Sequence, residues 1–214
     1  MTYDMSYNFC VCLKFRTEKK LNVGGAYAVK SRSDVPFQRI TVNGESYFYI
    51  PGSTIKGVLR TALIKVAGLL GYGNIPWTVD PGILTTSRDN IVSRIFGSPH
   101  DGRSKVYVEP AYITSDSKVI THIAIDDKSG ICREGALYTV EYLPIGVEFK
   151  TKVYARGLDL DEARALFTAI SELRFERIGK AGILDVMIVM RESRIPDELL
   201  KDDVIKLIVE VIGE

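Results

Sequence analysis

Hydrophobic and polar residues follow two kinds of pattern along this chain, one typical of strands and the other typical of helices. Residues 7–16 are rich in aromatic and β-branched side chains, and residues 183–190 form a second apolar segment of strand composition. Over residues 54–70 and 159–175, apolar side chains instead recur at helical spacing. The two patterns predict an α+β protein with two major helices.

The rest of the sequence predicts shorter elements between and after these segments. Further strands are expected over 105–113, 118–125, 136–142 and 147–155, with a projecting turn at 127–130. The dipeptide Asn43-Gly44 predicts a hairpin between 37–42 and 47–50. Short helices are expected over 89–96 and 197–212, and a strand over 204–212 is the alternative for the last one.

Helix caps and element order narrow the fold class. Ser53 or Thr54 is expected to cap the first major helix, and Asp159 or Asp161 the second. The mixed order of strands and helices suits a ferredoxin-like (RRM-like) α+β core with inserted loops and a β-hairpin. We expect one domain over 1–214, with its core at 7–190 and an acidic amphipathic segment at 195–214.

Composition agrees with an ordinary globular protein. Of the 214 residues, 46% are hydrophobic and 26% are charged, which excludes a disordered chain or a coiled coil. No apolar stretch approaches the ~18 residues of a membrane span, and the start of the sequence lacks signal-peptide features. The three cysteines form no disulfide framework and no zinc pattern. These features predict a cytoplasmic protein.

The distribution of charge is more informative than its sum. The net charge is +1, but residues 1–70 hold 10 Lys and Arg against 4 Asp and Glu. A basic N-terminal third is expected of a phosphate-binding face. The alternative is that these charges are scattered over a solvated surface.

A possible anion site follows the strand that ends at Ile50. Pro51-Gly52 turns the chain, and a helix then begins with the hydroxyl residues Ser53 and Thr54. Backbone N–H groups and the helix dipole attract anions there, and Lys56 and Arg60 lie four residues apart on one helix face. Gly57 would allow a nucleotide to approach closely. An ordinary capped helix with exposed basic residues explains the same sequence equally well.

A second glycine-containing segment, Gly179-Lys180-Ala181-Gly182, joins the second major helix to a strand. Two glycines around a lysine can hold a sugar-phosphate backbone through main-chain N–H groups. A helix C-cap followed by a turn is the simpler alternative.

Candidate catalytic residues are few. The only histidines, His100 and His122, have no metal-ligand spacing, and Cys132 has no suggestive partner. Asp34 lies in a long loop over 17–36, where its carboxylate could recruit a divalent cation or orient an attacking hydroxyl. Alternatively, Asp34 is a turn residue close to Pro36.

Several separated blocks of the sequence form one ordered pattern: residues 21–25, 34–36, 49–60, 95–97, 125–126 with 129–130, and 141–149. In order and spacing, these blocks resemble a RAMP-superfamily CRISPR protein. In particular, they resemble the repeating backbone subunit of type III (Csm-like) effector complexes, over roughly 7–190.

The resemblance implies a chain that associates with copies of itself along a guide RNA, with other CRISPR effector subunits and a complementary target RNA as partners and no membrane. It implies that Gly24, Gly25, Ser53, Thr54, Lys56, Gly57, Arg60, Gly179, Lys180 and Gly182 hold the guide. Asp34 matches the family aspartate, so it would support target cleavage by the adjacent 2′-hydroxyl with a divalent cation, Mg²⁺ or Mn²⁺. A hairpin that separates guide from target would include residues 125–137.

Two alternatives to this function remain open. In the first, the chain is a purely architectural RNA-binding subunit and Asp34 only shapes its loop. In the second, it is a guide-processing ribonuclease, which would rely on histidine acid–base chemistry.

Overall fold

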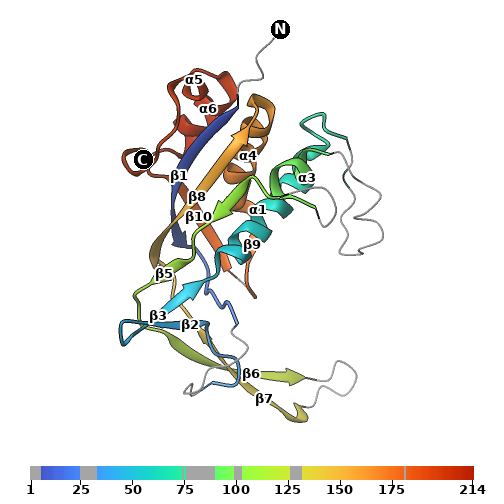
Figure 1. Ribbon diagram of the computed structural model, residues 1–214. Coiled ribbons are helices and arrows are strands. Elements are labelled where there is room, and N and C mark those ends of the chain that lie inside the picture. The colour runs from blue at the N-terminus through green and yellow to red at the C-terminus, as the bar shows by residue number, and fades with distance from the viewer. Residues whose placement is uncertain are drawn as a thin grey trace.

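A five-stranded antiparallel sheet, in the strand order β4-β8-β1-β10-β9, forms the centre of the molecule and carries two helices on one face (Figure 1). The computed structural model describes residues 6–24, 33–73, 75, 90–98, 103–125, 132–180 and 182–214. The elements of the central unit are β1 (Tyr7–Thr17), α1 (Gly52–Ala67), α3 (Ile91–Phe96), β4 (Val106–Val108), β8 (Glu148–Leu158), α4 (Leu160–Glu172), the 3₁₀ helix η1 (Leu173–Phe175), β9 (Arg177–Ile178) and β10 (Gly182–Ile188). The expected α+β class is confirmed.

Smaller elements extend from both ends of this unit (Figure 1). A three-stranded sheet, order β2-β3-β5, and a hairpin, β6-β7, lie at one end, and two short helices lie at the other. The elements are β2 (Arg39–Val42), β3 (Glu45–Ile50), β5 (Ala111–Ile113), β6 (Lys118–Ile125), β7 (Cys132–Tyr142), the 3₁₀ helix η2 (Met190–Glu192), α5 (Asp197–Leu200) and α6 (Asp203–Ile212).

The alternation of side chains along β1 determines which face of the sheet is covered. Phe9, Val11, Leu13 and Phe15 point to the helical face and are at most 5% exposed. Phe9 stacks on Phe167 of α4, with ring centroids 5.5 Å apart. Burying each of these side chains contributes about 2 kcal/mol, so β1 anchors the core. The alternate residues of β1 lie on the opposite face.

The two major helices begin differently. As predicted, Asp159 caps α4: its side chain accepts a hydrogen bond from the N–H of Glu162, and Glu162 bonds back to the Asp159 N–H. The predicted cap of α1 is wrong, because α1 begins at Gly52 after Pro51 with no side-chain cap. The N–H of Thr54 instead donates to the carbonyl of Pro51.

The first hairpin follows its turn chemistry. Asn43 and Gly44 both have positive φ, which the two-residue turn between β2 and β3 requires. The β6-β7 strands also pair as predicted. The turn expected at 127–130 lies outside the described residues.

Two predictions about other elements need correction, and one further element was not predicted. The strand expected over 105–113 divides into β4 and β5 around Glu109 and Pro110, with β4 paired to β8 and β5 paired to β3. The helix expected over 197–212 is two helices, α5 and α6, so the alternative of a strand over 204–212 is wrong. The short strand β9 was not predicted, because two residues carry no periodic pattern.

Asp202 separates α5 from α6 and makes contacts that a stability measurement can test. Its carboxylate caps the first N–H groups of α6 and pairs with Arg164 of α4 at 2.6 Å. The hydrogen bond from Arg164 lowers the pKa of the Asp202 carboxyl. The stabilisation is therefore complete above the unfolded-state pKa, near 4, and is lost as pH falls through the lower folded-state pKa.

Replacing Asp202 by alanine is expected to lower the unfolding free energy by about 2 kcal/mol at pH 7, since both the cap and the ion pair are lost. Urea denaturation at pH 7 and at pH 3 measures the effect. The difference between the two proteins should shrink at pH 3, and an equal difference at both pH values would contradict the ionic part of the explanation.

Among the described residues, no helix is both long enough and apolar enough to cross a membrane.

Candidate nucleic-acid interface

The start of α1 requires a glycine for a packing reason. A Cβ on Gly52 would lie 1.9 Å from the carbonyl oxygen of Val108, so any larger residue would displace β4. Within the described part of the chain, the N–H groups of Gly52 and Ser53 have no hydrogen-bond acceptor. Ser53 is exposed and Thr54 is half-buried. Gly52 is buried, so the Ser53 N–H and the two hydroxyls are the groups nearest the surface. The first turn of α1 carries no negative charge, as an anion site requires.

Two cations follow on the same helix. Lys56 donates to the hydroxyl of Ser104 at 2.6 Å, which ties its ammonium to the segment before β4. Burial, and then the charge of Arg60, lower the pKa of Lys56. Arg60 makes no ion pair with a described residue. An anion bound between the two side chains would relieve their repulsion, so the pair suits a phosphate.

Gly57 lies between these cations and is exposed. A Cβ at this position would meet nothing within 4 Å. Unlike Gly52, Gly57 is therefore not required for packing within the described protein. Its missing side chain leaves open space directly beside Lys56 and Arg60.

Asp34 is exposed and is held by one residue of β7. Its Oδ2 accepts hydrogen bonds from the N–H of Thr139 at 2.7 Å and from the Thr139 hydroxyl at 2.8 Å, while the Asp34 N–H donates to the same hydroxyl. The backbone hydrogen bond from Thr139 is the main cause that lowers the pKa of Asp34. Asp34 is thus a carboxylate at neutral pH, and its Oδ1 has no partner among the described residues.

A buried glutamate supports the loop that carries Asp34, and the sequence analysis missed it. Glu141 of β7 is 3% exposed and accepts hydrogen bonds from the N–H of Phe37, from Arg39 and from Ser117. Backbone bonds between Val35 and β7 add to this connection. The sequence signal, a charged residue within an apolar strand, was present. Its partners were not predictable, because they lie far away along the chain.

The two glycine-containing segments meet in the structure. The carbonyl of Asn22, two residues before Gly24, accepts a hydrogen bond from the Lys180 N–H at 3.0 Å. A Cβ on Gly179, which has a φ of +65°, would lie 2.0 Å from that carbonyl oxygen. A Cβ on Gly182 would lie 2.3 Å from the Leu21 side chain. Both glycines thus allow the close contact of two chain segments.

The turn at 179–182 lies between two strands, whereas the sequence predicted that it joins the second major helix to a strand. It connects β9 to β10 and does not directly follow a helix, so the C-cap alternative is wrong. Lys180 is exposed at this turn, and Gly24, two residues after Asn22, is also exposed. Gly25 lies outside the described residues.

His122 is engaged in an aromatic cluster on the β6-β7 hairpin. Its ring stacks on Tyr138 with centroids 5.3 Å apart, and its Nε2 lies 3.1 Å from the hydroxyl of Tyr142. His100 lies outside the described residues. The described part of the chain therefore offers one histidine, already paired with tyrosines, for acid–base chemistry.

Few carboxylates are available at the candidate site to hold a divalent cation. The described residues contain no cluster of three or more His, Cys, Asp or Glu that could hold a metal ion. Asp34 by itself supplies one possible metal ligand, the carboxylate oxygen Oδ1, which has no hydrogen-bond partner among the described residues. Mg²⁺ commonly binds through one or two carboxylates and completes its coordination with water and substrate phosphates. The site therefore fits a cation shared with RNA.

One comparison with known proteins identifies the family of this chain. A comparison with curated proteins gave no match. The sequence matches the family model of the RAMP superfamily over residues 14–183, which include Asp34, the start of α1 and the turn at 179–182. The match covers well over half of the chain. Sequence and architecture together show that the chain belongs to the RAMP superfamily of CRISPR-associated, RNA-binding proteins.

Proposed function

We propose that this chain is a guide-RNA-binding backbone subunit of a type III CRISPR interference complex, in which Asp34 supports cleavage of the bound target RNA. The observation that carries the proposal is the setting of Asp34. It is an exposed, ionised carboxylate that Thr139 holds against the hairpin strand β7. Copies of the chain would lie side by side along the guide, together with other effector subunits.

The proposed core is ferredoxin-like. The elements β1, α1, β4, β8, α4 and β10 follow one another in the order β-α-β-β-α-β, with β1 antiparallel to both β8 and β10. Strand order β10-β1-β8-β4 supports this assignment. The remaining elements are then insertions into this core or, for η2, α5 and α6, a C-terminal extension of it.

The proposed reaction is attack of a target 2′-oxygen on the adjacent phosphorus, which forms a 2′,3′-cyclic phosphate and breaks the bond to the 5′-oxygen. The 2′-hydroxyl releases its proton to solvent and the leaving 5′-oxygen takes one up, so the reaction requires RNA and excludes DNA. Because the pKa of Asp34 is lowered, its carboxylate is a weak proton acceptor at neutral pH and is better suited to hold positive charge. A bound divalent cation, Mg²⁺ or Mn²⁺, would supply that charge beside the scissile phosphate. Asp34 would hold the cation, and Thr139 would orient Asp34.

The α1 interface can be tested by removing its two cations. Lys56→Ala/Arg60→Ala is expected to weaken guide-RNA binding and to reduce the slope of log K against log salt by about 1.4, since each phosphate contact on a single strand contributes about 0.7. Fluorescence anisotropy of a labelled guide at several salt concentrations measures both quantities. Lys201→Ala/Lys206→Ala removes the same charge from exposed sites, one just after α5 and one on α6, and is the control.

An unchanged affinity and salt slope in the Lys56→Ala/Arg60→Ala protein would reject α1 as the guide-binding element.

A second candidate function, a purely architectural RNA-binding subunit, is favoured by one observation. The Asp34 carboxylate accepts two hydrogen bonds from Thr139, so the residue already has a role in loop shape. In that case Asp34 would be needed for assembly alone, and another subunit would perform the chemistry.

A further inference from the structure

The face of the central sheet opposite α1 and α4 is not covered evenly. On β8, Lys150, Lys152, Tyr154 and Arg156 alternate with buried residues and point to this open face. Near one end of the face, Lys150 pairs with Glu192, and Lys14 of β1 pairs with Glu214. These C-terminal acids neutralise that end.

Next to these ion pairs, the open face forms a groove of about 670 Å³. β1 and β8 form its floor, and the segment after β10 forms one wall. Lys152, Arg156, Arg191 and Arg194 all line it, and Glu192, already paired with Lys150, is its acidic residue. None of the four cations makes an ion pair with a described residue. Arg156, Arg191 and Arg194 are exposed, so positive charge is concentrated along the groove.

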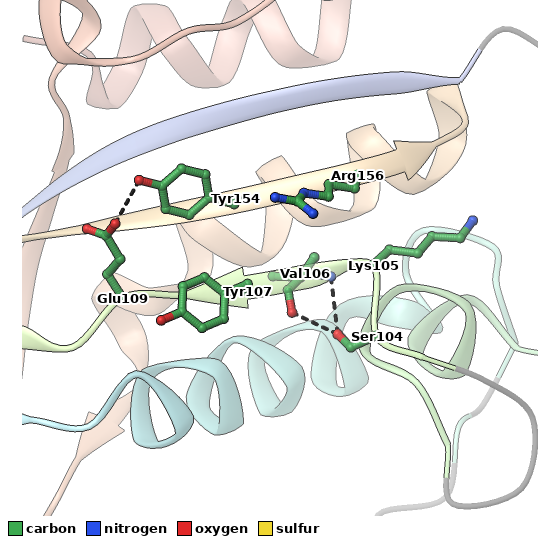
Figure 2. Close-up of a pocket in the computed structure, with 7 residues that line it drawn as sticks. All are labelled: Ser104, Lys105, Val106, Tyr107, Glu109, Tyr154 and Arg156. Atoms are coloured by element: carbon green, nitrogen blue, oxygen red, sulfur yellow. Dashed lines mark hydrogen bonds between the residues drawn. The ribbon is translucent and has the colours of Figure 1, made fainter.

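Two tyrosines continue the groove across β8 to β4. A second hollow of about 430 Å³ shares Tyr154 and Arg156 with the first and is also lined by Tyr107. The rings of Tyr107 and Tyr154 lie side by side on neighbouring strands, with centroids 6.1 Å apart (Figure 2). Tyr107 is 61% exposed, so its ring is accessible from solution.

The Tyr154 hydroxyl donates to Glu109 at 2.7 Å, and this bond raises the pKa of Tyr154 to about 12. The tyrosine therefore stays uncharged, and Glu109 is occupied by the hydrogen bond (Figure 2). Glu109 fixes the ring across the groove and adds one negative charge at the β4 end. The four cations outweigh it.

We propose that this groove is a second binding site for single-stranded RNA, separate from the start of α1. Phosphates would contact the cations, and bases would stack on Tyr107 and Tyr154. Sequence-tolerant single-strand binding combines a basic groove with exposed aromatic rings in this way. An acidic protein segment would use the cations alone, whereas RNA accounts for both the cations and the rings. The proposal does not depend on the function assigned to Asp34 or to α1.

The test compares RNA binding by the full chain and by variants of each site. The probe is a fluorescein-labelled 12-nucleotide poly(U) RNA, and its affinity is measured by anisotropy at several salt concentrations. Both Arg191→Ala/Arg194→Ala and Tyr107→Ala are made in the native chain and in the Lys56→Ala/Arg60→Ala chain. All three groove side chains are exposed, so these variants should keep their fold.

Each groove variant is expected to weaken binding about tenfold in both backgrounds. The arginine pair should also reduce the salt slope by about 1.4, whereas Tyr107→Ala should leave the slope unchanged. Lys201→Ala/Lys206→Ala controls for net charge and should have no effect. Crosslinking of a 4-thiouridine RNA should label peptides that contain Tyr107 or Tyr154.

Unchanged affinity in the groove variants would overturn the proposal, even if Lys56→Ala/Arg60→Ala abolished binding and so supported the α1 interface. Loss of self-association with unchanged RNA affinity, measured by sedimentation, would also overturn it and would make the groove a protein interface. If only the α1 variant kept its affinity, the groove would stand and the α1 assignment would fail.

Discussion

Replacing Asp34 by alanine is expected to lower target-RNA cleavage by the assembled complex on the order of a hundredfold or more. The substitution removes the carboxylate that would hold a divalent cation beside the scissile phosphate. Guide binding and assembly should remain intact, since Asp34 is exposed and contacts only Thr139 among the described residues. Cleavage of an end-labelled, guide-matched RNA measures the effect. Divalent cation and a chelator are included in parallel.

Asp34→Asn is the matched control, because it separates charge from shape. An asparagine oxygen can still accept the hydrogen bonds from Thr139, but it carries no charge. Loss of cleavage in both variants would support a catalytic Asp34. Cleavage that survives in Asp34→Asn and fails only in Asp34→Ala would leave Asp34 as a residue that shapes its loop.

The lowered pKa of Asp34 also predicts the pH dependence of cleavage. A carboxyl group with a lowered pKa is already ionised at pH 5, so its titration should not change the cleavage rate between pH 5 and 8. A cleavage rate that rises through an inflection between pH 6 and 7 would instead indicate a histidine. Cleavage that proceeds without added metal and is lost in His122→Ala would support a guide-processing ribonuclease.

The second large effect concerns two glycines of α1 with opposite surroundings. Gly52→Ala is expected to lower the unfolding free energy by about 3 kcal/mol and the Tm by about 10 °C, because its Cβ would overlap the Val108 carbonyl oxygen. Gly57→Ala should raise the unfolding free energy by about 1 kcal/mol, since its Cβ meets open space and alanine favours the helix. Urea and thermal denaturation measure both changes.

RNA binding by the Gly57→Ala protein then tests the role of this residue separately from stability. If a nucleotide approaches the backbone at Gly57, the added methyl group should weaken guide binding in a protein that is more stable. Unchanged binding would mean that the guide passes elsewhere, and a Gly52→Ala protein as stable as the native one would contradict the packing described at β4.

Local patterns in the sequence determined most of the secondary structure. The composition of β1, the helical spacing in α1 and α4, the Asp159 cap and the Asn43-Gly44 turn depend on residues a few positions apart, and each was predicted. The ordered sequence blocks also identified the superfamily, because their order and spacing match those of segments that the fold brings together. Errors occurred where the local signal was weak, as in β9, or where a charged residue interrupted a helix, as at Asp202.

Only the tertiary structure determined how the candidate residues meet. Asp34 and Thr139 are 105 positions apart, and no local pattern in the sequence pairs them. The contact of Gly179 with Asn22 also joins segments that are far apart in the sequence. The same is true of the groove lined by four cations, Lys152, Arg156, Arg191 and Arg194. Sequence periodicity fixes which face of a strand or helix is apolar, because that depends on backbone geometry. Which distant segments then lie against each other depends on how those faces pack, and that is a property of the whole chain.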